Sequence, residues 1–121
     1  MKSIVLKVIT SLFLILPSFN TFGEEVSLRL NEQGCMLFSQ LFGAVGNDKI
    51  IDKVPLAKQM QILEDMDLRP ELKEFVKFVI HNVYKSKATT VEEYNVFGMM
   101  FLDQCMSNRG LVTFQKVPDG V

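Results

Sequence analysis

The sequence predicts an all-α fold, a compact bundle of about four helices with one disulfide between the first and last helices. Three observations predict it. Four successive segments carry apolar residues at three- and four-residue spacing, and turns rich in glycine or proline separate them. The two cysteines, Cys35 and Cys105, lie on the apolar stripes of the first and fourth segments. We therefore expect one helical domain over residues 24–121.

The first helix is predicted from about Leu28 to Val45. Its apolar residues form two adjacent rows, and together these make a stripe wider than one face of a solvated helix requires. The rows are Cys35, Phe38, Phe42 and Val45, and Gly34, Leu37, Leu41 and Ala44. Gly46, Asn47 and Asp48 follow, and these residue types tolerate the left-handed conformation of a helix end. We therefore expect the helix to end there.

Proline marks the start of the next two helices. A short second helix begins near Pro55, a residue suited to a first helical turn, and its inner face holds Leu56, Met60 and Leu63. The third helix runs from Pro70 to about Lys85. Its apolar residues repeat at helical spacing: Leu72, Phe75, Val76, Val79, Ile80 and Val83. A buried strand is the alternative for this β-branched run, but the run is too long for one.

The fourth helix opens with a capping box, because Thr90 is followed three residues later by Glu93. Its apolar stripe ends at Cys105, and Asn108 to Gly110 terminate it. From about residue 111 the chain alternates partly between apolar and polar residues. We expect an extended tail that packs over the bundle or across a subunit boundary, with a loosely ordered tail as the alternative.

Residues 1–23 have the pattern of a cleavable signal peptide. Lys2 and Lys7 precede an apolar run that Pro17 ends, and small residues lie at the −3 and −1 positions relative to a cleavage site after Gly23. The run is shorter than the roughly 20 residues that span a bilayer, which disfavours an uncleaved anchor. We therefore expect export to the periplasm and no membrane attachment after cleavage.

Charge and cysteine count narrow the function further. The chain has 13 basic and 14 acidic residues, and because two lysines lie in the leader, the exported part is mildly acidic. Such a charge disfavours nucleic acid and anionic membranes as partners. In an exported chain, two cysteines predict a disulfide between Cys35 and Cys105, which closes a loop of about 70 residues and stabilises by roughly 4 kcal/mol. Metal ligation and a reactive thiol fit less well, because a zinc set would be incomplete and no Cys-x-x-Cys pair is present.

The sequence lacks the patterns typical of catalysis. His81 is the only histidine, and a set built from Ser39, His81 and Asp103 has no nucleophile elbow. Paired carboxylates occur only at the exported terminus, in a turn and in a first helical turn, and no phosphate loop, EF-hand or metal-ligand cluster is present. We therefore expect a protein that is not an enzyme and that uses no cofactor and no metal.

The exported part carries more phenylalanine and methionine than a domain of this size needs. One interpretation is a thick core in which methionine fills irregular gaps. The other is an exposed apolar patch for a second copy or a protein partner. Because small domains bury a modest fraction of their surface, we favour a homodimer.

Short features spread over most of the exported chain carry a family resemblance. These are the leader, Gly34-Cys35 in the first helix, Val83-Tyr84 in the third, Thr90-Val91-Glu92-Glu93-Tyr94 opening the fourth and Cys105 closing it. The chain resembles the small periplasmic immunity proteins of type VI secretion that neutralise lysozyme-like VgrG effectors of Vibrio, and phage periplasmic lysozyme inhibitors are similar in build. The resemblance implies a periplasmic protein that binds and blocks a cell-wall hydrolase effector and so protects the producing cell.

An inhibitor needs a rigid surface rather than catalytic groups of its own, because preorganisation lowers the entropic cost of association. The cleft of a wall hydrolase carries carboxylates, so basic and amide side chains are candidates to engage it, with aromatic residues as anchors. The predicted partner-binding residues are Arg29, Gln33, Phe38, Gln40, Phe42 and Lys49.

A periplasmic acid-stress chaperone is the alternative function. Such proteins are also small, exported, helical and held by a single disulfide, and they release apolar surface when carboxylates are protonated. The few charges on this chain disfavour that function.

Overall fold

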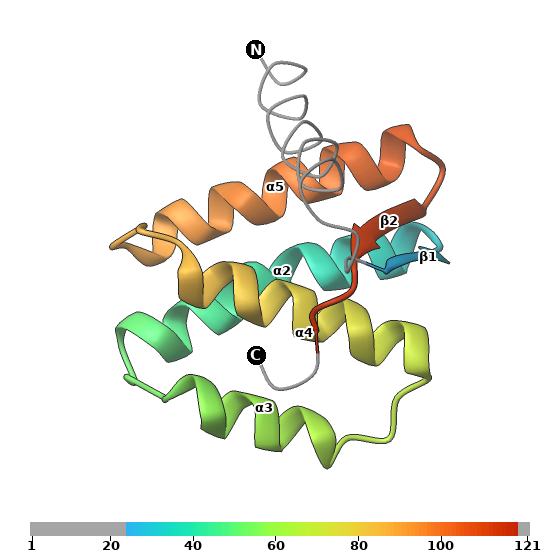
Figure 1. The fold of residues 1–121 in the computed structure, drawn as a ribbon. Coiled ribbons are helices and arrows are strands. Elements are labelled where there is room, and N and C mark those ends of the chain that lie inside the picture. The colour runs from blue at the N-terminus through green and yellow to red at the C-terminus, as the bar shows by residue number, and fades with distance from the viewer. Residues whose placement is uncertain (1–23, 119–121) are drawn as a thin grey trace.

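The computed structural model describes residues 24–118, which form four helices and a two-stranded sheet (Figure 1). In chain order the elements are β1 (Glu25–Arg29), α2 (Glu32–Ile50), α3 (Leu56–Glu64), α4 (Pro70–Lys85), α5 (Val91–Ser107) and β2 (Leu111–Gln115). The predicted helical bundle is confirmed in its number of helices within this part of the chain. The predicted signal peptide, residues 1–23, lies outside the described residues.

The all-α prediction is wrong at the two ends of the domain, where the chain forms a small antiparallel sheet. Strand β1 pairs with β2, with Glu25 opposite Gln115 and Arg29 opposite Leu111. Leu28, expected to begin the first helix, lies instead on the buried side of β1. The extended conformation predicted after Gly110 is confirmed. For Leu111–Gln115 the alternative of a loose tail is wrong, because these residues pair with β1, and residues 119–121 lie outside the described part of the chain.

A glycine turn brings the end of α5 to the start of this sheet. Gly110 has φ +85°, and a Cβ atom there would collide with the carbonyl oxygen of Leu30. The Leu30 N–H donates to the Gly110 carbonyl at 2.8 Å. The next residue, Asn31, caps α2 by accepting from the Gly34 N–H at 2.7 Å. The sheet therefore meets the first turn of α2 directly.

Most helix boundaries follow the sequence signals. Thr90 caps α5 by accepting from the Glu93 N–H at 3.3 Å, and the Glu93 carboxylate accepts from the Thr89 N–H at 3.2 Å, one residue beyond the usual capping-box partner. The predicted end of the first helix at Gly46 is wrong, since α2 continues to Ile50. Gly46 is buried against the ring of Tyr94 and serves helix packing rather than helix termination.

The closest helix pair is α2 with α5, which lie side by side in Figure 1. Cys35 and Cys105 form the predicted disulfide between them, with 5.8 Å between their Cα atoms, and both side chains are buried. About one turn along α2 from Cys35, the Ser39 carbonyl lies against Gly98 of α5, where a Cβ atom would not fit. The disulfide and the glycines together hold these two backbones at close range.

Helix α4 packs onto this pair through an aromatic cluster centred on Phe75. The Phe75 ring lies 5.5 Å from Phe38 of α2, 5.4 Å from Phe101 of α5 and 5.3 Å from Phe114 of β2, measured between ring centroids. The Phe75 side chain is 1% exposed. A single side chain therefore joins α4 to both long helices and to the sheet.

Removing the disulfide tests how much the α2–α5 pair contributes to stability. We expect the Cys35→Ala/Cys105→Ala double variant to lose about 4 kcal/mol of unfolding free energy, because the unfolded chain regains the freedom of a long loop. Urea denaturation followed by circular dichroism measures this loss. An unchanged midpoint and slope would show that noncovalent packing alone holds the two helices.

A glycine substitution tests the close approach itself. We expect Gly98→Ala to lower stability by about 1–3 kcal/mol, because the added methyl group meets the Ser39 backbone, which cannot swing away. Gly43→Ala is the matched control, since its methyl group meets the side-chain amide of exposed Asn95, which can rotate. Thermal unfolding of both variants would contradict this account if they lost stability equally.

Candidate functional site

An apolar groove lies between α2 and α3 and is floored by α4. We name it the α2–α3 groove, and its volume is about 360 Å³. This lies within the range of pockets that bind ligands or side-chain anchors. It is lined by Leu37, Phe38, Leu41, Ala44, Val45, Asp48, Gln59, Ile62, Leu63, Met66, Leu68, Val76 and Ile80.

The α2 wall of the groove comes from the second apolar row of that helix. Leu37, Leu41 and Ala44 follow one another at helical spacing, and Leu37 is 63% exposed. In the first row, Cys35 and Phe42 contact α5, while Phe38 and Val45 also line the groove. The unusual width of the stripe seen in the sequence therefore has a structural cause, because α2 serves two surfaces.

The α3 wall is formed by a short helix whose inner residue, Leu63, is buried in the core. Ile62 and Met66, one on α3 and one in the turn after it, line the groove and remain 47% and 45% exposed. Together with Leu37 they place three large, solvent-exposed apolar side chains around one hollow. Apolar surface gathered in this way on a small protein marks an interaction site more often than scattered residues do.

One end of the groove is closed by a polar chain of three side chains. Gln59 donates from Nε2 to Asp48 Oδ2 at 2.8 Å, and the Tyr84 hydroxyl donates to the Val54 carbonyl at 2.6 Å. Burial raises the pKa of Tyr84 above its ordinary value, while its hydrogen bond with Gln59 lowers it and the negative charge of Asp48 raises it further. Tyr84 therefore acts as a neutral donor that fixes the loop between α2 and α3.

The predicted partner-binding residues on α2 divide between two faces. Gln33 and Gln40 are exposed on the outer face of the helix. Phe38 lines the groove, and its ring also packs edge-on against Phe75. Phe42 is half-buried, with its ring centroid 5.6 Å from that of Phe101. Phe38 is thus the member of this set that belongs to the groove.

The two predicted basic contacts lie at opposite ends of α2. Arg29 is in β1 and donates from Nη1 to the Arg109 carbonyl at 3.0 Å. Lys49 donates from Nζ to the carbonyls of Val83 and Ser86 at 3.0 and 2.9 Å and to the Tyr94 hydroxyl at 2.9 Å. Its ammonium group therefore caps the C-terminus of α4, where a positive charge is favourable. The part of these two residues in partner binding stays a prediction.

Sequence reasoning missed the α3 half of the groove. Ile62 and Met66 are not among the partner-binding residues predicted from the sequence. The width of the α2 stripe was the available signal, because Leu37, Leu41 and Ala44 have to face a second partner. The sequence pattern does not give the distance between α2 and α3. That distance determines whether the apolar residues of the two helices form a closed core or an open groove.

The residues of the Ser39, His81 and Asp103 set lie on three different helices, α2, α4 and α5. The Ser39 hydroxyl donates to the Met36 carbonyl at 2.6 Å, and His81 is buried within α4. Among residues 24–118, no group of three or more histidine, cysteine or acidic side chains is arranged to hold a metal ion. In the same range, no helix combines the length and apolar character needed to cross a bilayer.

A variant of Tyr84 tests the polar end of the groove. We expect Tyr84→Phe to lose about 1 kcal/mol of stability near neutral pH, because the Val54 carbonyl loses its donor. A raised pKa in the folded state means that this contribution is complete below pH 10 and disappears as pH rises through the raised value. Urea denaturation should therefore show the gap between wild type and variant constant from about pH 6 to 9 and narrower above 10. A gap that widens above pH 10 would contradict the assignment.

Comparisons with known proteins leave the family open. No family model, no curated protein and no solved structure matches this chain. The function proposed next therefore rests on the groove, the disulfide and the chemistry of the residues around them.

Proposed function

We propose that this protein is exported to the bacterial periplasm, where it binds and blocks a peptidoglycan-degrading, lysozyme-like toxin and so protects the producing cell. The observation that carries the proposal is the open, apolar α2–α3 groove on a body braced by a disulfide. In this proposal the protein acts by occupying the hydrolase and has no catalytic role of its own.

Two observations, the disulfide and the leader pattern, support export. The disulfide between buried Cys35 and Cys105 indicates an oxidising compartment, since such bonds are rare in the reducing cytosol. The leader pattern of residues 1–23 supplies a route to the periplasm. Peptidoglycan and the enzymes that cut it meet in the same compartment.

Inhibition by occupancy fits the construction of the groove. One wall is α2, which the disulfide and the glycines hold against α5, and the floor is α4, which Phe75 holds. A wall that is already ordered loses little conformational freedom on binding. Leu37, Ile62 and Met66 then supply apolar contact area at the centre of the interface, where most binding energy resides.

The homodimer predicted from the sequence remains a proposal beside this one. Outside the groove lining, α2 exposes Met36 and α5 exposes Met99 and Met106. Because Met36 and Met106 directly follow the two disulfide-bonded cysteines, they lie at the same end of the helix pair. This second apolar surface is available to another copy while the groove holds the hydrolase.

The proposal is tested with the protein purified from periplasm and with the product of the neighbouring open reading frame, which the proposal expects to be a wall hydrolase. We expect a stable complex and loss of peptidoglycan clearing at one inhibitor per hydrolase, measured by turbidity, with the mature chain beginning at Glu24 by mass spectrometry. An unrelated muramidase is the control and should stay active. Full clearing in the presence of excess protein would refute the proposal, and binding of a hydrophobic dye only at pH 2–3 would then favour the acid-stress chaperone.

A further inference from the structure

The polar groups at the α2–α3 groove carry negative charge. Its lining contains one ionisable side chain, Asp48, at the end next to Gln59. At the other end, Met66 lies between Asp65 and Asp67, both exposed in the turn after α3. A carboxylate therefore lies in the lining at one end of the hollow, and two exposed carboxylates flank a lining residue at the other.

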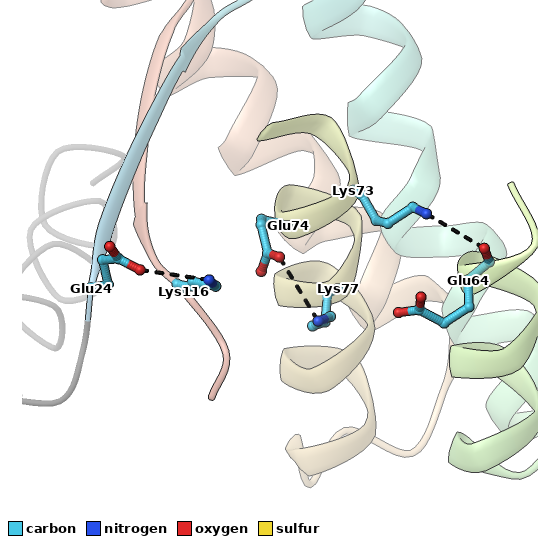
Figure 2. Close-up of polar contacts among 6 residues, drawn as sticks. All are labelled: Glu24, Glu64, Lys73, Glu74, Lys77 and Lys116. Carbon is cyan, nitrogen blue, oxygen red and sulfur yellow. Dashed lines mark hydrogen bonds and ion pairs between the residues drawn. The ribbon is translucent and has the colours of Figure 1, made fainter. Parts of the chain in front are cut away.

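The nearby positive charges compensate this border only in part. Lys49 follows Asp48, but its ammonium group is held by the C-terminus of α4 and by Tyr94. Lys73 reaches from α4 toward α3, where its Nζ lies 3.4 Å from the Glu64 carbonyl oxygen (Figure 2). Arg69, exposed after the turn, and Lys58, exposed on α3, are the remaining cations of the two segments that border the groove from the α3 side. Together with Asp48, the acidic residues Glu64, Asp65 and Asp67 are four carboxylates against the three cations Lys58, Arg69 and Lys73.

From this complementarity we propose that the groove binds a segment of the hydrolase that presents an apolar anchor flanked by lysine or arginine. This inference rests on the proposed function and adds the chemistry of the contact. An apolar side chain fills the hollow between Leu37, Ile62 and Met66, and the flanking cations meet Asp48 at one end and Asp65 and Asp67 at the other. Basic amphipathic segments bind apolar grooves with acidic borders in this manner.

A second copy of this chain fits the groove less well. Two grooves facing each other would oppose carboxylates. The other exposed apolar face, on α2 and α5, offers no better match, because α5 contains no lysine or arginine and carries Glu92, Glu93 and Asp103. Like charges opposed across an interface are unfavourable. The groove therefore selects a cationic protein partner over itself.

The sign of the charge also places the contact on the hydrolase. Enzymes that cut the wall sugar use a pair of carboxylates in the cleft, and these would repel the border of the groove. In this proposal the inhibitor binds a basic surface beside the cleft and sterically blocks the access of peptidoglycan. This is the opposite polarity from the engagement of cleft carboxylates by Arg29 and Lys49 that the sequence led us to expect.

Two labelled amphipathic helical peptides test the groove directly. They share one leucine face, and the polar face carries lysine in one and glutamate in the other. We expect fluorescence anisotropy to show binding of the lysine peptide, weakening with added salt, and little binding of the glutamate peptide. Leu37→Asp should reduce the affinity by about tenfold or more, and Asp65→Asn/Asp67→Asn by about three- to tenfold.

Met99→Asp is the matched control for Leu37→Asp, because Met99 is 67% exposed on α5, a helix that contributes no residue to the groove lining. The same variants are then assayed against the hydrolase. The proposal is overturned if Leu37→Asp binds peptide and hydrolase as Met99→Asp does, if the glutamate peptide binds as tightly, or if sedimentation shows a dimer that Leu37→Asp dissolves. If Leu37→Asp still inhibits the hydrolase, the proposed role of the groove is refuted and the proposed function stands. If the wild type binds the lysine peptide but does not inhibit the hydrolase, the proposed function is refuted and the binding chemistry of the groove stands.

Discussion

The close approach of α2 and α5 is the constraint on which the rest of the structure depends. The disulfide fixes one end of this pair, and Gly98 and Gly46 allow the backbones to stay close along its length. Gly46 makes room for the Tyr94 ring and Gly98 for the Ser39 carbonyl, and Phe42 packs against Phe101 in the same interface. Aromatic side chains of both helices also reach beyond the pair. Helix α4 takes up most of these through Phe75, which touches both helices and β2. The pair is thus a template against which the remaining elements pack.

This arrangement also explains why an open groove remains. A wide apolar stripe on α2 has one half facing α5, and the other half needs a cover. Helix α3 is the only further helix among the described residues, and it is short, with Leu63 in the core and Ile62 at the edge. It covers part of the stripe and leaves Leu37 exposed. The groove is therefore what remains when a nineteen-residue helix is covered by a nine-residue one.

Much of this fold is encoded locally and was predictable. Pro70 and Thr90 each begin a helix at the expected residue, because proline and capping signals act within one turn. The strand pair was not predictable in the same way. Leu28 and Phe114 are apolar residues in short segments far apart in the chain, and only their pairing separates a strand from a frayed helix end. The prediction that the first helix ends at Gly46 was wrong for a related reason, since a glycine at a helix end and a glycine under an aromatic ring look alike in sequence.

The candidate site shows where local patterns stop being informative about function. From the sequence, Lys49 is an unpaired cation near the end of an amphipathic helix, and such a residue suits an acidic partner. In the folded chain the Lys49 ammonium group is hydrogen-bonded to the carbonyls of Val83 and Ser86 and to the Tyr94 hydroxyl, none of which lines the groove, whereas the ionisable side chain in the groove lining is Asp48. Hydrogen bonds to neutral groups keep the charge of Lys49 but fix its position. The sign of a binding surface therefore depends on where internal hydrogen bonds hold each charge, and net composition does not contain those positions.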